Sequence, residues 1–166
     1  MLRLIISVAI VSLTIAGLGY AFIFWRAQDP SVVSAAALGQ SPDPALVEML
    51  RAEAASAVMG WWSLVALAMA VAALVWLLLA LRRRPQSPAE ARSGGLSWWV
   101  LLIVAVLAAL AAGGAVYMNE AVAAGWRMAL LLGGALVVPV AYWLTTAFGV
   151  QNEMAPSVPF ATALRS

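Results

Sequence analysis

Four long apolar runs dominate the chain. They cover residues 4–25, 61–81, 97–118 and 126–148. The only charged residue within them is Arg127, at the start of the last run. A helix rises about 1.5 Å per residue, so about 20 residues cross the hydrocarbon core of a bilayer, which is about 30 Å thick. The pattern therefore predicts an all-α fold, an integral membrane four-helix bundle, with 1–166 forming a single membrane domain.

The first run has a second interpretation, a cleavable signal peptide with Arg3 at its positively charged end. Its apolar stretch of about 20 residues is longer than the signal-peptide core of about 7–15 residues. It also closes on aromatic residues that end in Trp25, which is typical of a membrane anchor. We therefore expect a retained span.

Arginine asymmetry predicts the orientation of the bundle, because loops rich in Arg stay on the cytoplasmic side. The connection 82–96 begins with three consecutive arginines, and Arg3 and Arg165 lie near the two termini. We expect both termini and this basic inner loop to be cytoplasmic. The outer loop 26–58 and the turn before the fourth span then carry three arginines against five acidic residues.

Composition limits the chemistry that this chain can perform. Apolar residues make up 65% of its 166 residues, and the sequence contains no Cys, no His and no Lys. These absences exclude thiolate nucleophiles, imidazole-ligated haem and Schiff-base lysines. We expect no catalytic residue, no cofactor and no metal site. Arginines beside a span end are ordinary topology determinants, so we also expect no nucleic-acid partner.

The outer loop has a helical pattern in its second half. Asp43 can cap a helix that starts with Pro44, and apolar residues then recur at helical spacing from Val47 and Leu50 onward. A short amphipathic outer helix is predicted over residues 44–58. The pattern leaves open whether this helix lies flat on the membrane or extends the second span.

Small residues recur at helical spacing in every span and favour close helix packing. Gly113-Gly114 and Gly133-Gly134 are the predicted points of closest contact. Pro139 predicts a kink in the fourth span, where Thr145 or Thr146 can help to satisfy local carbonyls. The tail 149–166 lacks helical periodicity, so we expect it to be extended and mobile unless a partner orders it.

Function is predicted mainly by exclusion. The spans lack a mid-membrane charge of the kind that ion and proton pathways use. Glu120 and Arg127 are expected to form a surface ion pair across the last outer turn. We expect a non-catalytic accessory or scaffolding subunit of a larger bacterial inner-membrane complex, with respiratory and photosynthetic electron transfer as the assemblies considered. The alternative is a small homo-oligomeric channel or transporter.

Besides the lipid bilayer, the expected partners are other membrane protein subunits. Tryptophans at span ends are typical of the membrane interface and are also common in protein contacts. The predicted partner-contact residues are Val47, Leu50, Trp61, Trp62, Trp98 and Trp99.

Overall fold

The computed structural model describes residues 2–39, 43–83, 95–149 and 158–161. Four of its helices are long and apolar enough to cross a membrane, as predicted. They are α1 (Leu2–Ala27), α3 (Pro44–Arg83), α5 (Gly95–Tyr117) and α6 (Ala124–Gly149). Two short helical turns, η1 (Pro30–Val32) and α2 (Ala35–Leu38), lie between α1 and α3. The chain is an all-helical, multi-pass membrane bundle.

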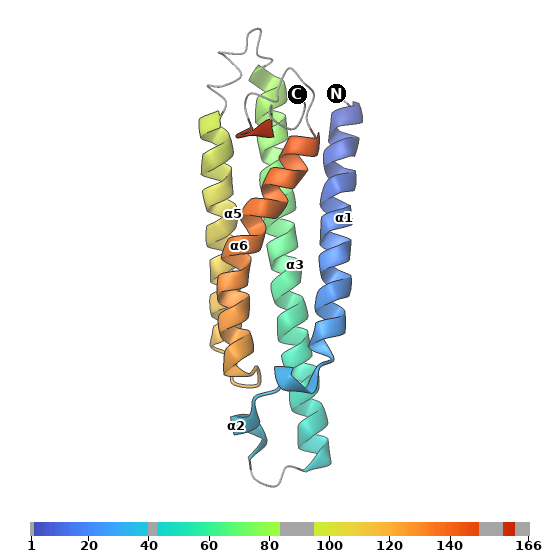
Figure 1. Cartoon of the computed structure of the whole chain (residues 1–166), viewed down its shortest axis with the longest axis vertical. Coiled ribbons are helices and arrows are strands. Elements are labelled where there is room, and N and C mark those ends of the chain that lie inside the picture. The colour runs from blue at the N-terminus through green and yellow to red at the C-terminus, as the bar shows by residue number, and fades with distance from the viewer. Residues whose placement is uncertain (1, 40–42, 84–94, 150–157, 162–166) are drawn as a thin grey trace.

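The four long helices stand side by side (Figure 1). Helix α3 packs against α1, α5 and α6, and α6 also packs against α1 and α5. Helix α1 begins and α6 ends at the same end of the bundle, which we call the terminal end (Figure 1). At the opposite end lie α2 and the turn between α5 and α6. We call it the projection end, because the first turns of α3 extend there beyond the other helices.

Helix α3 is much longer than a membrane span. It runs without interruption for 40 residues, or about 60 Å, twice the thickness of the hydrocarbon core. The predicted helix over 44–58 is therefore continuous with the second span, which answers the question that the sequence left open. The start of α3 is as predicted, because the Asp43 carboxylate accepts a hydrogen bond of 3.0 Å from the Ala45 N–H.

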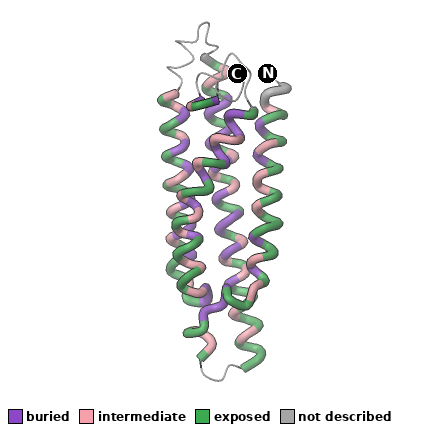
Figure 2. The backbone as a smooth tube through the Cα atoms, viewed as in Figure 1, coloured by how far each residue is buried: buried purple, intermediate pink, exposed green. Residues whose placement is uncertain are grey.

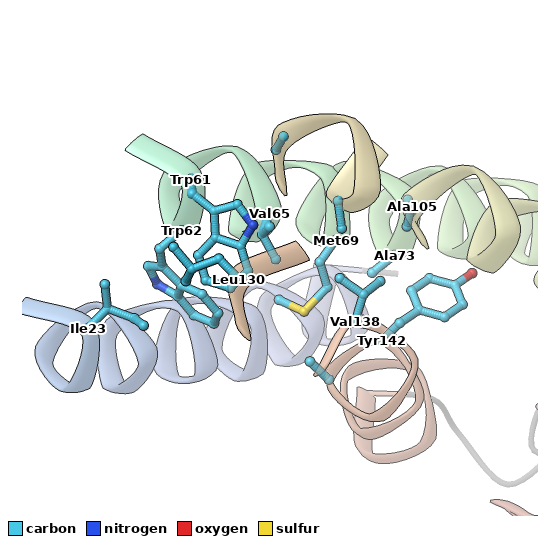
Figure 3. Packing of buried hydrophobic residues seen from close by; sticks show 14 of the residues in the cluster. Ile23, Trp61, Trp62, Val65, Met69, Ala73, Ala105, Leu130, Val138 and Tyr142 are labelled. Atoms are coloured by element: carbon cyan, nitrogen blue, oxygen red, sulfur yellow. The ribbon is translucent and has the colours of Figure 1, made fainter. Parts of the chain in front are cut away.

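The bundle core contains large side chains from the central helices. Met69 and Trp76 of α3 and Val138 and Tyr142 of α6 are all almost completely buried. Figure 3 shows Met69, Val138 and Tyr142 pointing into the space between these helices. Helix α1 is more peripheral: 11% of its most apolar segment is buried, against 33% in each of the other spans.

One glycine in each predicted pair makes a close helix contact. A Cβ added at Gly113 would lie 2.8 Å from the Cα of Leu131 on α6, and one at Gly134 would lie 3.3 Å from the Cβ of Ala109 on α5. A Cβ at Gly114 or Gly133 would meet nothing within 4 Å. We call the packed contact between two neighbouring helices a seam. The close approach in the α5–α6 seam therefore depends on Gly113 above all.

Helix α6 passes through Pro139 and changes direction along its length, as Figure 1 shows. The hydroxyl of Thr146 donates to the carbonyl oxygens of Tyr142 at 2.9 Å and Trp143 at 3.2 Å. Thr146 therefore bonds the carbonyls of the turn before it, and not the carbonyl of Ala135, which loses its N–H donor at Pro139.

The prediction of an extended tail is wrong for residues 158–161, which form a turn packed on the bundle. Val158 and Ala161 are buried, and the Trp143 indole N–H donates to the Pro159 carbonyl at 2.7 Å. The sequence prediction treated the tail as lacking internal contacts, whereas apolar burial and this hydrogen bond hold the segment on the bundle. The other tail residues and most of the basic loop 82–96 lie outside the described residues.

Candidate functional site

The first turns of α3, together with α2, form a projection beyond the ends of the other helices (Figure 1). Val47 and Leu50 are half-buried in it, and Leu38 of α2 and Leu50 both pack against the buried core. Leu46 and Met49 face outward, with 37% and 58% of their surfaces exposed. Most residues of the projection are exposed in Figure 2.

Sequence reasoning selected Val47 and Leu50 because they belong to the apolar stripe of the helix. That stripe turns toward the protein, which is the usual place for such a face. The apolar residues outside the stripe, Leu46 and Met49, are the ones left on the surface. Their position off the main periodicity is the signal that could have found them.

Backbone hydrogen bonds fix the base of the projection. The Ser34 N–H donates to the Ala121 carbonyl at 2.9 Å, and the Ala123 N–H donates to the Val32 carbonyl at 2.8 Å. These bonds join the segment after α1 to the turn between α5 and α6. Val32 and Val122 are buried beneath them, so the connection is both hydrogen-bonded and packed.

A cluster of charged and aromatic side chains lies beside this base. The Arg26 guanidinium lies 5.7 Å from the ring centroid of Trp25 and 5.5 Å from that of Trp126. It also pairs with Asp29 at 3.7 Å. The Trp126 indole N–H donates to the Ser31 hydroxyl at 3.3 Å. The end of α1, the η1 turn and the start of α6 are thereby connected.

Asp29 caps η1 in its charged form. The Ser31 backbone N–H donates to its carboxylate at 2.9 Å. This bond, the Ser31 hydroxyl and the Arg26 charge together hold the pKa of Asp29 below its usual value of 3.8. Each of these contacts favours the carboxylate over the protonated acid.

The predicted pairing of Glu120 with Arg127 is not among the ion pairs of the described residues, which join Arg26 to Asp29 and Arg51 to Glu48. The Arg127 guanidinium instead donates to the Tyr117 carbonyl at 3.2 Å and lies 5.9 Å from the centroid of its ring. Tyr117 is the last residue of α5, where free carbonyls attract a cation. Arg127 therefore caps α5.

Three of the four tryptophans proposed as partner contacts are buried inside the chain. Trp61, Trp62 and Trp98 are 4%, 6% and 2% exposed. The Trp62 indole N–H donates to the Ala16 carbonyl of α1 at 3.0 Å. In Figure 3 its ring lies beside α1, near Ile23. Trp99 is 48% exposed and is the tryptophan of this set that keeps a free surface.

Trp98 takes part in a hydrogen-bonded chain between helices at the terminal end. Its indole N–H donates to the Thr146 hydroxyl at 2.9 Å, and that hydroxyl donates to the Tyr142 carbonyl. The Trp98 and Tyr142 rings are 5.0 Å apart between centroids. Such interhelical bonds stabilise helix association in lipid, where apolar burial offers little.

Among the residues that the structure describes, no three or more acidic side chains lie close enough together to hold a metal ion. The exposed part of the projection, centred on Leu46 and Met49, is the candidate functional surface. Comparison with protein-family models, with curated proteins and with solved structures finds no match for this chain.

Proposed function

We propose that this chain is a non-catalytic accessory subunit of a larger bacterial inner-membrane complex, of the respiratory or photosynthetic kind. In this proposal both termini are cytoplasmic, and the projection lies on the outer side, where it docks on a partner subunit. The observation that supports the proposal is the uninterrupted extension of α3, which presents apolar side chains beyond the ends of the other helices.

The exposed surface of Leu46 and Met49 has an energetic cost in water. Burying apolar surface contributes about 25 cal/mol per Å². A leucine that faces lipid tails gains no further hydrophobic free energy when a partner covers it, because the tails are equally apolar. At the projection the surroundings are aqueous, so a partner that covers these two side chains gains the full hydrophobic contribution.

The absence of His, Cys and Lys from the sequence supports a structural role. General acid–base and nucleophilic catalysis usually use one of these side chains or a carboxylate placed beside a partner group. The hydrogen bonds at the base of the projection join η1 and the segment after it to the α5–α6 turn, and α3 packs against η1 and α2. A fixed surface suits a subunit that orients or stabilises its neighbours.

The test compares a double variant and a single variant at the projection end. Met49→Asp, combined with Leu46→Asp, puts charge on the proposed docking surface. Met118→Asp, in the turn after α5 where Met118 is 80% exposed, is the matched control. After gentle-detergent extraction from the native host, native mass spectrometry should show a stoichiometric hetero-complex that the double variant loses and the control keeps. Retention by the double variant would rule out this surface.

The alternative, a homo-oligomeric channel or transporter, has one supporting feature. A groove of about 640 Å³ runs between α3 and α5. Alanines such as Ala68, Ala72, Ala108 and Ala112 line it, and small residues allow a further helix to approach closely. A homo-oligomer without other chains in the same experiment would favour this alternative.

The orientation can be tested separately because the chain has no native cysteine. Ala36→Cys, in α2, and Ala89→Cys, in the basic loop, each introduce a single thiol. A membrane-impermeant maleimide applied to spheroplasts should label Cys at position 36 and leave position 89 unlabelled until the membrane is opened. The reverse pattern would invert the topology.

A further inference from the structure

The described part of the tail, residues 158–161, forms a hook that returns along α6. Pro159 accepts its hydrogen bond from Trp143, which lies six residues before the end of α6 at Gly149. Six helical residues span about 9 Å. The hook therefore lies beside the apolar segment of α6 and not beyond its end, and Phe160 in the hook is 79% exposed.

The hook closes one side of a groove with a volume of about 450 Å³. The other walls come from Trp99 and Leu102 on α5 and from Val140 and Trp143 on α6. Trp99 and Val140 are 48% and 59% exposed, so the groove opens toward the surrounding lipid. Its volume is within the range of about 300–1,000 Å³ that is usual for small-molecule sites.

The charges at this end of the bundle indicate the head group of the occupant. The last turn of helix α3 lies at this end of the bundle and carries exposed Arg82. Basic residues near a membrane surface attract anionic lipids. The groove itself has apolar walls, which suit a hydrocarbon chain.

We propose that this groove binds an acyl chain of an anionic phospholipid, whose head group lies toward Arg82 in the last turn of α3. The tryptophans are at the depth that indole rings prefer, between hydrocarbon and head groups. The hook makes the site a preformed slot, so that the lipid stays longer than one on a flat helix face. This inference is independent of the projection and its partner.

The first experiment fills the groove. Val140→Trp places a large ring in it, and Leu136→Trp is the matched control, one turn earlier on α6, 72% exposed and outside the groove walls. Each protein is reconstituted in equal amounts of phosphatidylglycerol and phosphatidylcholine, extracted in mild detergent and examined by native mass spectrometry. The wild type and Leu136→Trp should retain phosphatidylglycerol over phosphatidylcholine by at least about fivefold, the contribution of about one arginine. Val140→Trp should lose this retention.

The second experiment opens the slot without filling it. Trp143→Phe removes the indole N–H that holds Pro159, so lipid retention should fall as it does in Val140→Trp while helix content by circular dichroism stays at the wild-type value.

Equal retention by Val140→Trp and the wild type would overturn the site, and equal retention of the two lipids would overturn the anionic preference. A protein chain that co-purifies with the wild type in place of lipid, and is lost from Val140→Trp, would assign the groove to a partner helix and also overturn the proposal.

Discussion

The seam between α5 and α6 and the seam between α1 and α3 both depend on a glycine, but for different reasons. At Gly113 the backbone of α6 comes close to that of α5, and a Cβ added there would lie 2.8 Å from the Cα of Leu131. At Gly19 an aromatic side chain enters, because a Cβ there would overlap the Trp62 ring. In the α5–α6 seam two backbones pack closely. In the α1–α3 seam the Trp62 ring packs against Gly19, and its indole N–H donates a hydrogen bond to the Ala16 carbonyl.

This difference shows what makes helix packing specific in lipid, which is as apolar as the helix surfaces. Hydrophobicity does not distinguish the faces of these spans, because lipid covers an apolar face as well as another helix does. Close approach and interhelical hydrogen bonds then decide the packing. Helix α1 has the lowest buried share, and the Trp62 ring with its hydrogen bond to Ala16 is one contact that fixes it against α3.

Gly113→Ala should have the largest effect on stability. The added Cβ meets backbone, which cannot rotate away, so α5 and α6 must separate. We expect a loss of about 2–3 kcal/mol in the free energy of unfolding, as is typical of overpacking. Denaturant titration in micelles, followed by circular dichroism, measures it.

The matched control is Gly114→Ala, where the Cβ meets nothing within 4 Å. This variant should be neutral or slightly more stable, because alanine has the higher helix propensity by about 1 kcal/mol. Equal effects at the two positions would mean that the α5–α6 seam is not set by backbone approach.

Gly19→Ala should have the next largest effect. The new methyl group displaces the Trp62 ring, which also loses its hydrogen bond to Ala16. We expect a loss of about 2 kcal/mol from overpacking, concentrated in the docking of α1. Cysteines introduced in α1 and α3 and joined by a short cross-linker would report that docking directly. Gly17→Ala, where a Cβ meets nothing within 4 Å, should cross-link like the parent protein.

Trp62→Phe separates the hydrogen bond from the ring. Phenylalanine keeps an aromatic side chain beside Gly19 but has no N–H for the Ala16 carbonyl. Interhelical hydrogen bonds in membrane proteins contribute about 0.6 kcal/mol on average, so the expected loss is about 1 kcal/mol or less. A loss as large as that of Gly19→Ala would show that the hydrogen bond, not the space at Gly19, holds α1 in place.

The sequence predicts the spans well and their contacts poorly, for a physical reason. The bilayer requires long apolar helices, so their number and approximate ends follow from hydropathy. Nothing comparable selects one apolar face over another. Trp62 and Trp98, at span ends, were therefore assigned to partners, although one fits against Gly19 and the other finds Thr146 within the bundle.

The hook and the projection show the same limit outside the spans. The pattern and the cap predict the helix over 44–58. They do not predict whether it continues into the second span, because nothing local distinguishes a bend from a continuous helix at Gly60. The hook depends on the burial of Val158 and Ala161 and on one hydrogen bond from Trp143 to Pro159, residues 16 positions apart. A long-range contact of this kind leaves no periodic signal in the sequence.

The smallest expected effect concerns the cluster at the projection end, which connects the two seams through Arg26 and Trp126. Asp29→Asn keeps an acceptor for the Ser31 N–H and removes the charge. Because the folded-state pKa of Asp29 lies below 3.8, its charge stabilises the fold above that pH, and this contribution is lost as the pH falls through the folded-state pKa. The thermal midpoint of the wild type should exceed that of Asp29→Asn slightly at neutral pH, and the two should converge once the pH is below the folded-state pKa of Asp29. A difference that stays constant with pH would mean that the shape of the cap, and not its charge, stabilises this end of the bundle.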